Sequence, residues 1–103
     1  MENNKTYNIE FSPKSLKDLE KFSISTQEKI VENLNYLKKN FNGTFLTKIK
    51  RLKSFGENIY RYRVENYRVI VTFIENKIVI LRIIDRKELE KIIKNQKKKF
   101  GIR

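Results

Sequence analysis

Residues 59–84 read IYRYRVENYRVIVTFIENKIVILRII, and this stretch decides the fold. Residues 59–64, 67–74 and 77–84 are rich in β-branched and aromatic residues, and in the first of these segments Tyr and Arg alternate with the period of two that is typical of strands. The strands are separated by Glu65-Asn66 and Glu75-Asn76, each short enough for a two-residue hairpin turn. The stretch therefore predicts a β-meander of antiparallel strands.

Two helices are predicted before the meander. Ser12 precedes Pro13, as an N-cap precedes proline at the first helical position, and the apolar stripe of this helix extends over residues 13–22. A second helix is predicted over residues 25–41, because Ser25-Thr26-Gln27-Glu28 fits a capping box and apolar residues then recur every three to four positions. Asn42-Gly43 ends it with residues that tolerate positive φ.

The remaining elements complete an α+β domain. Strands are predicted over residues 5–11 and 45–52, where the period is two, and a terminal helix begins at the capping box Asp85-Arg86-Lys87-Glu88. The order β-α-α-β-β-β-α indicates an antiparallel sheet with the two N-terminal helices on one face and a C-terminal helix. We expect a single domain over residues 1–103, with a basic tail from about 95–103.

The composition excludes several kinds of chemistry. The 103 residues contain no Cys and no His, which removes disulfides, a thiolate nucleophile and Cys/His zinc sites, so we expect no metal and no cofactor. Twenty-four Lys and Arg against 12 Asp and Glu give a net charge of +12, which favours a polyanionic partner such as nucleic acid, or an acidic protein. Without an apolar stretch of membrane length or a secretory signal, the expected location is the cytoplasm.

Arginines cluster on one predicted face of the meander. Residues 48–68 contain seven basic and two acidic residues. Strand alternation places the tyrosines at 60 and 62 against the helices and Arg61, Arg63 and Arg68 together on the exposed face, around one hairpin. Guanidinium groups suit phosphate binding because they stay charged and present a planar set of donors, although strand arginines can also simply solvate an open face. The flanking basic residues, predicted to bind RNA, are Lys48, Lys50, Arg51 and Lys53.

An apolar strip is predicted beside these arginines. Alternation turns Ile70 and Ile74 outward, and in the last strand it assigns Val79, Leu81 and Ile83 to the helix face and Ile80 to the outer face. Such a strip has to be covered either by the terminal helix or by a separate protein. The residues predicted to meet a protein partner are Ile70, Ile74 and Ile80.

Residues 52–71 resemble the central motif of the RelE/ParE superfamily of bacterial toxins, commonly written L-K-G, a loop, then l-Y-R-i-R-v-g-d-Y-R-v-i-y. The predicted order of elements also agrees from about Tyr7 to Ile93. The resemblance implies a cytosolic toxin that is neutralised by a cognate, acidic antitoxin. In the RelE-like branches it implies a toxin that enters the ribosomal A site and cleaves mRNA without a metal.

The resemblance also suggests which residues act. Arg61, Arg63 and Arg68 match basic positions of the family. The stretch that the family commonly writes H-R-x-x-V-Y corresponds here to residues 85–90. In this stretch Arg86 matches the Arg, whereas Asp85 stands in place of the His and Glu90 stands in place of the Tyr. Cleavage by the 2′-OH, which gives a 2′,3′-cyclic phosphate and a 5′-OH, needs a base, an acid and positive charge on the phosphorane. The arginines supply the charge. The candidates for the base are Asp85, Glu88 and Glu90, of which Asp85 is also the expected N-cap.

Two other functions remain open at the level of the sequence. A ParE-like toxin would inhibit DNA gyrase by binding, without catalytic residues, and the altered residues 85 and 90 would then need no explanation. A toxin-like protein without activity would survive as an antitoxin-binding regulator. The retained arginines favour the nuclease, and the two altered positions favour the alternatives.

Overall fold

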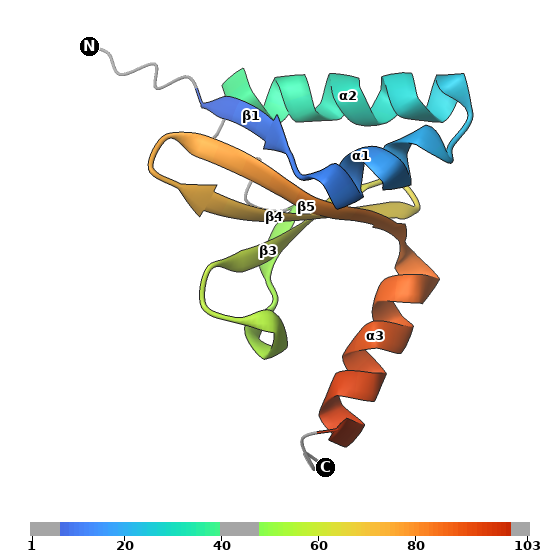
Figure 1. Ribbon diagram of the computed structural model, residues 1–103, viewed down its shortest axis with the longest axis vertical. Helices are drawn as coiled ribbons and strands as arrows, with labels where there is room; N and C mark the ends of the chain where they lie inside the picture. Colours follow the sequence, from blue (N-terminus) through green and yellow to red (C-terminus); the bar gives the residue numbers. More distant parts are fainter. Residues whose placement is uncertain (1–6, 40–47, 100–103) are drawn as a thin grey trace.

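The computed structural model describes residues 7–39 and 48–99, which form a five-stranded sheet with helices on both faces (Figure 1). The strand order across the sheet is β1-β5-β4-β3-β2. The elements are β1 (Asn8–Phe11), α1 (Pro13–Glu20), α2 (Ile24–Lys39), β2 (Ile49–Arg51), the 3₁₀ turn η2 (Lys53–Phe55), β3 (Ile59–Val64), β4 (Tyr67–Ile74), β5 (Lys77–Asp85) and α3 (Arg86–Lys99).

The α+β class, the meander and the strand predicted within residues 45–52 are confirmed, while the sheet differs from the prediction in one way. Strand β2 lies in that range and pairs with β3, so the sheet has the five strands that the predicted ranges give, although the order β-α-α-β-β-β-α counts only four. Strand β1 runs parallel to β5, with Ile9 opposite Ile78, so the sheet is mixed rather than wholly antiparallel. The outer edge of β5 would otherwise expose its backbone groups, and β1 pairs with them there.

The start of α1 agrees with the sequence prediction, and the start of α2 differs from it. The Ser12 hydroxyl accepts a hydrogen bond from the Ser15 amide at 3.1 Å, which confirms it as the N-cap of α1. The cap of α2 is Ser23 rather than Ser25, since the Ser23 hydroxyl accepts from the Thr26 amide at 3.2 Å. The chain has already turned by Phe22, whose amide donates to the Leu19 carbonyl, so α2 can begin two residues earlier. The predicted stop at Asn42-Gly43 lies outside the described residues.

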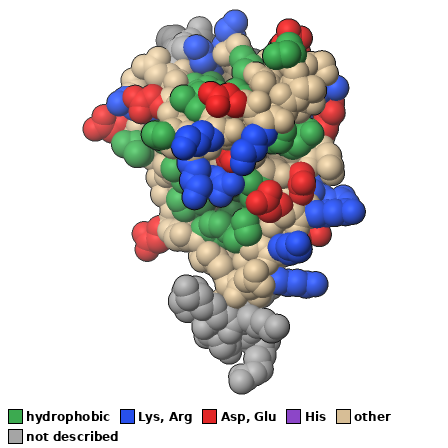
Figure 2. Space-filling model, turned by 45° about the vertical axis from the view of Figure 1, so that its right-hand side comes forward, with side chains coloured by type: hydrophobic (Ala, Val, Ile, Leu, Met, Phe, Trp, Pro, Cys, Tyr) green, Lys and Arg blue, Asp and Glu red, His purple; other side chains and the backbone are tan. Residues whose placement is uncertain are grey.

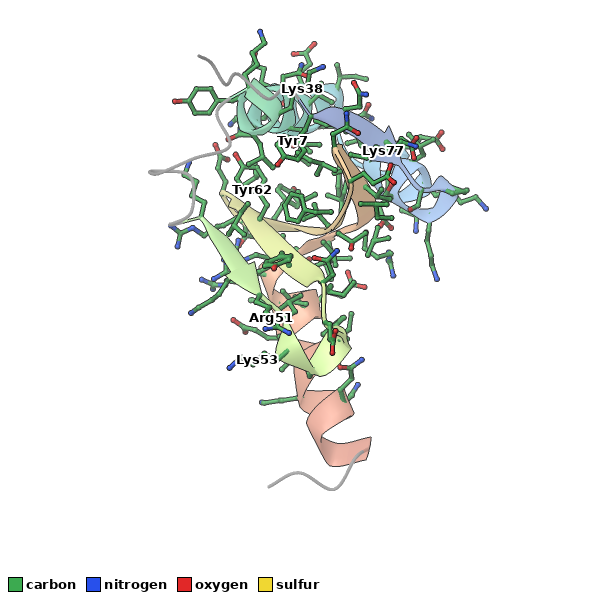
Figure 3. The ribbon with its side chains drawn as sticks, turned by 90° about the vertical axis from the view of Figure 1, so that its left-hand side faces the viewer. Tyr7, Lys38, Arg51, Lys53, Tyr62 and Lys77 are labelled. Carbon is green, nitrogen blue, oxygen red and sulfur yellow. The ribbon has the colours of Figure 1, made fainter. Side chains whose placement is uncertain are left out.

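The main core lies between the sheet and the helices α1 and α2. Tyr62 is its largest fully buried side chain and points from the sheet toward α2 (Figure 3), where its hydroxyl donates to the Asn33 carbonyl at 3.2 Å. This bond satisfies the polar end of an otherwise apolar side chain. The other buried members are Ile30, Leu34, Leu37, Val64, Val69, Val71, Ile78, Ile80 and Ile83.

A second, smaller cluster lies on the opposite face, beneath α3. Its buried members are Leu52 of the turn before η2, Ile70 of β4, Ile84 of β5 and Leu89 of α3. Figure 1 shows α3 leaving the sheet on the side away from α1 and α2. Because few residues hold it, α3 covers only part of this face, and the charged side chains beside it remain near solvent.

A β-bulge in β5 changes which residues face the main core. Val71 pairs with Ile80 but Ile70 pairs with Arg82, so Leu81 is an additional residue in the ladder. The sequence alternation assigned Ile80 to the outer face, and this prediction is wrong: Ile80 joins Ile78 in the main core, and Leu81 packs against the cluster under α3. Alternation fails here because a bulge shifts the period of two by one residue.

Asp18 of α1 forms hydrogen bonds to β5 at and directly after this bulge. Its carboxylate accepts hydrogen bonds from the Ile83 amide at 2.8 Å and from Nε and Nη2 of Arg82 at 2.8 and 3.1 Å. Burial alone would raise the pKa of Asp18, but the hydrogen bonds from Arg82 and Ile83 and the charges of Arg82 and Lys21 outweigh burial and hold the pKa below its ordinary value. The ionised carboxylate therefore serves as the acceptor for the Ile83 amide of β5, beyond the residues that pair with β1.

Candidate phosphate-binding site

Basic side chains converge on the face of the sheet opposite the main core. Arg63 lies directly opposite Arg68 in the β3–β4 ladder, and Lys50 of β2 lies opposite Arg61. Side chains that oppose each other in this way lie about 5 Å apart at Cβ. Figure 2 shows Lys and Arg side chains gathered at the height of the sheet, between the helices above and the narrow end of the molecule below. The predicted convergence of Arg61, Arg63 and Arg68 on one face is therefore what the strand register produces.

Arg68 lies at the centre of this group and is nearly buried, with 9% of its surface exposed. Its Nη1 donates hydrogen bonds to the carbonyls of Glu65 and Tyr67, each at 2.9 Å, so the β3–β4 hairpin holds the guanidinium in a fixed orientation. Nε and Nη2 remain for a ligand, since no hydrogen bond of the described residues engages them.

The electrostatic surroundings of Arg68 define the site. Burial lowers its pKa, the positive charges of Arg61, Arg63 and Arg86 lower it further, and Glu90 alone opposes them. The pKa of Arg61 is also lowered, by burial and by Arg63. Four guanidinium groups and one carboxylate thus act on one another here, and we call these five residues the arginine cluster. Like charges brought together in this way favour the binding of an anion.

Helix α3 brings Arg86 and Glu90 to the arginine cluster. The Arg86 amide donates to the Asn66 carbonyl at 2.9 Å, which joins the start of α3 to the β3–β4 hairpin. Arg86 Nε lies 3.8 Å from a carboxylate oxygen of Glu90 one helical turn later, and both side chains are more than half exposed. Because both side chains are exposed, this ion pair contributes little to the stability of the fold. The same exposure leaves both charged groups accessible to a ligand.

The three carboxylates that the sequence offered as bases have different surroundings. Asp85 accepts a hydrogen bond from the Glu88 amide at 2.8 Å, which confirms it as the N-cap of α3. Glu88 faces the other side of the helix, where it adds to the increase in the pKa of Arg82 that the hydrogen bond to Asp18 mainly causes. Glu90 is the carboxylate beside Arg68 and Arg86.

The predicted RNA-binding residues border the cluster along the sheet edge. Lys48, Lys50, Arg51 and Lys53 are all exposed. Figure 3 shows Arg51 and Lys53 on β2 and η2, on the side of the sheet from which α3 extends. Arg61 Nη1 donates to the Lys48 carbonyl at 3.5 Å, so this edge joins the arginine cluster directly. RNA binding by these residues stays a prediction.

The apolar strip predicted for a protein partner is largely covered within the chain itself. Ile80 is fully buried in the main core because of the bulge, and Ile70 is only 4% exposed because α3 covers it through Leu89. Of the two possible coverings of the strip, the terminal helix and a separate protein, the terminal helix therefore covers Ile70. Ile74, which is 51% exposed, is the member that a partner can reach.

Sequence reasoning missed Asp18 and Arg82, which shape the site indirectly by fixing the bulge before Asp85. One signal was present in the sequence: Ser15, Asp18 and the apolar Leu19 follow the helical spacing i, i+3, i+4, so they share one face of α1, and the structure buries both Ser15 and Asp18. A charged residue on the inner face of a helix requires a partner of opposite sign, and Arg82 is an arginine within an apolar strand.

Two further observations concern the described residues as a whole. No group of three acidic side chains among residues 7–39 and 48–99 lies close enough together to hold a metal ion. None of the helices in these ranges is long and apolar enough to span a membrane.

Known proteins resemble this chain in sequence and in fold. The family described as "ParE toxin of type II toxin-antitoxin system, parDE" matches residues 9–90. A curated relative from Methanocaldococcus jannaschii that carries the toxin name RelE1 is 36% identical over 83 residues, which is 80% of this chain and 91% of the relative.

Solved structures give the same picture. The RelBE2 toxin-antitoxin complex from Mycobacterium tuberculosis has a chain that matches with a TM-score of 0.67 at 23% identity, over 79% of this chain and 99% of that one. A chain of the YoeB-YefM complex from Staphylococcus aureus matches with a TM-score of 0.61 at 28% identity, over 76% of this chain and 94% of that one.

Proposed function

Because this chain belongs to the ParE toxin family of type II toxin-antitoxin systems, with RelE-like relatives, we propose that it is a metal-independent endoribonuclease that cleaves mRNA on the ribosome, in the cytoplasm. The observation that carries the proposal is the arginine cluster, in which a nearly buried Arg68 is surrounded by three guanidinium groups and the carboxylate of Glu90. A cluster of this kind suits a reaction whose transition state concentrates negative charge on phosphate oxygens.

In the proposed reaction Glu90 acts as the base. It removes the proton from a 2′-OH, the 2′ oxygen bonds to the adjacent phosphorus, and the bond from phosphorus to the 5′ oxygen breaks. The products are a 2′,3′-cyclic phosphate and a 5′-OH, whose proton comes from solvent. Arg68 and Arg86 stabilise the charge on the phosphorane, and Arg61 and Arg63 that on the leaving oxygen. Glu90 is preferred over Asp85, whose carboxylate caps α3, and over Glu88, which faces Arg82.

We further propose that a cognate acidic antitoxin neutralises the toxin. The net charge of +12 supports a partner of opposite sign, and two of the matching solved structures are described as toxin-antitoxin complexes, RelBE2 from Mycobacterium tuberculosis and YoeB-YefM from Staphylococcus aureus. Ile74 is the accessible apolar contact that we assign to this partner. An antitoxin that binds only the folded toxin should raise its melting temperature.

The test is cleavage by variants of the exposed residues of the cluster. Arg86→Ala should lower the cleavage rate about 100-fold or more, because one donor to the transition state is lost, and primer extension on mRNA from expressing cells should show no cuts within codons. The exposed Arg86 is a cleaner choice than Arg68, whose side chain also holds the hairpin and whose removal would also destabilise the fold. Arg86→Lys should rescue little because a point charge does not replace a planar fork of donors.

Glu90→Gln provides the matched test of the base. It keeps the size and helix propensity of the residue but removes the group that takes the proton, so cleavage should fall while melting temperature stays within about 2 °C of the wild type. Glu88→Gln, the same substitution at an exposed glutamate that faces Arg82 on the other side of α3, is the control and should retain the wild-type cleavage rate. Cleavage at the wild-type rate by both Arg86→Ala and Glu90→Gln would rule out this mechanism.

A second candidate is a ParE-like inhibitor of DNA gyrase that acts by binding alone. It is favoured by Asp85 and Glu90 standing at the positions where the nucleases commonly carry His and Tyr. In this case expression should induce a DNA damage response without cuts in mRNA. A homologue without either activity, retained as an antitoxin-binding regulator, would produce neither.

A further inference from the structure

The outward face of α3 carries a line of lysines that the proposed reaction does not use. Leu89, Ile92 and Ile93 pack toward the sheet. Lys87, Lys91 and Lys94 follow the spacing i, i+4, i+7 on the opposite side of the helix, and all three are exposed. We call these three residues the lysine ridge.

Among the described residues the lysine ridge forms no salt bridge, although Asp85, Glu88 and Glu90 line the hollows beside it. The salt bridges of the described residues engage Lys29, Lys77, Arg82 and Arg86, and none includes a residue of the ridge. Lys87 and Lys91 also line shallow hollows on both sides of the helix, one with Glu90 and Ile93 and the other with Asp85 and Asn95. The ammonium groups can therefore reach a ligand that approaches α3 from either side.

The shape of the lysine ridge fits a phosphate backbone. Lys94 lies seven positions after Lys87, which is about 10 Å along the helix at 1.5 Å per residue. One strand of a nucleic acid duplex carries about three charges over that length. In the sequence, three more lysines follow up to Lys99.

An acidic protein fits the same surface less well. Interfaces between proteins are depleted in Lys and depend on a few aromatic, Arg or apolar anchors in desolvated pockets. Between Lys87 and Lys94 the outward line of α3 offers no aromatic or Arg anchor, and Leu89, Ile92 and Ile93 pack against the cluster under α3. Contacts to phosphates, in contrast, need only mobile positive charges.

We propose that the lysine ridge is a second, sequence-independent RNA-binding surface, which holds the backbone of a folded RNA while the arginine cluster acts on the strand that is cleaved. The inference rests on the proposed function in assuming an RNA partner, but it concerns affinity and not the chemical step. Folded RNA is the expected ligand because its paired strands present phosphates in a regular row.

The test compares two triple variants of the full chain that remove the same charge. The ridge variant is Lys87→Gln, Lys91→Gln and Lys94→Gln, and the control variant is Lys14→Gln, Lys17→Gln and Lys39→Gln, three exposed lysines of α1 and α2. Fluorescence anisotropy with a labelled 20-base-pair RNA hairpin between 50 and 200 mM KCl gives the slope of log K against log salt. The ridge variant should reduce the magnitude of this slope by about 2 to 3. The factor by which its affinity falls between 50 and 200 mM KCl should therefore be about 16 to 60 times smaller than the factor for the wild type. The control variant should change the slope by less than about 1.

Equal slopes for the ridge variant and the wild type, or equal reductions in the ridge and control variants, would overturn the proposal. So would competition by poly-L-glutamate that matches unlabelled RNA charge for charge, because the surface would then belong to an acidic protein. If a triple variant fails to fold, Lys91→Gln alone should lower the slope by about 0.9, and no change in it would count against the ridge. RNA binding without cleavage by the wild type would reject the proposed nuclease and leave this inference intact.

Discussion

The two faces of the sheet are both covered by helices, but they are built for different tasks. The apolar core under α1 and α2 has ten buried members, of which only the hydrogen-bonded Tyr62 carries a polar group, and Ser15 and Asp18 of α1 are buried beside it. The face under α3 buries four, and beside them lie the guanidinium groups of the arginine cluster. Burial stabilises apolar side chains, whereas like charges repel least when solvent screens them. The molecule therefore concentrates its stability on one face and its charge on the other.

The largest expected effect tests this difference directly. Leu34→Ala in the main core should lower the free energy of unfolding by about 3 to 4 kcal/mol, because Leu34 is 1% exposed and its loss leaves a cavity among rigid neighbours. Leu89→Ala, the same substitution under α3, should cost about 2 kcal/mol, since a cluster of only four buried residues can collapse more easily around the space. Urea denaturation measures both, and equal costs would contradict the comparison.

The next effect concerns the bond that joins α1 to the bulge of β5. Asp18→Asn should destabilise the protein by about 2 to 3 kcal/mol. The substitution removes the negative charge that pairs with Arg82, and it weakens the acceptor of the hydrogen bond from the Ile83 amide. Since the pKa of Asp18 is lowered on folding, its contribution is complete above about pH 4 and is lost as pH falls through the folded pKa. Thermal unfolding between pH 2 and 6 should show a smaller acid-dependent loss in the variant than in the wild type.

A smaller effect belongs to the cap of α3. Asp85→Ala should cost about 1 kcal/mol and loosen the start of the helix that carries Arg86 and Glu90, because the Glu88 amide loses its acceptor. Asp85→Asn retains a capping oxygen and should change both stability and cleavage little. A large loss of cleavage with Asp85→Asn at unchanged melting temperature would instead make Asp85 the base, in place of Glu90.

The smallest effect is expected at the sheet edge. Glu10 and Lys77 form a salt bridge of 3.1 Å between β1 and β5, in which both side chains are about half exposed. Glu10→Gln should therefore change the free energy of unfolding by less than about 0.5 kcal/mol, and high salt should remove even this difference. A cost as large as that of Asp18→Asn would mean that the parallel pairing of β1 depends on this charge.

Local chemistry accounts for the parts of the site that could be predicted. Arg61, Arg63 and Arg68 share a face because the tight turn at Glu65-Asn66 fixes the register of the two strands, and Glu65 has the positive φ that such a turn requires. The role of Asp85 as a cap follows from its position before Arg86 and the amide three residues later. The choice of Glu90 over Glu88 could not be predicted, because it depends on how α3 is rotated against the sheet.

The sequence by itself determined the order of the elements, the hairpin turns and the first and last helix caps, because each depends on residues within a few positions of one another. Only the tertiary structure decided that β1 joins β5 in parallel, that Ile80 turns inward at the bulge and that α3 covers Ile70. These features are pairings between distant segments. The carboxylate of Asp18, 65 residues from the Ile83 amide that it binds, stabilises a break in the strand period that no local pattern contains.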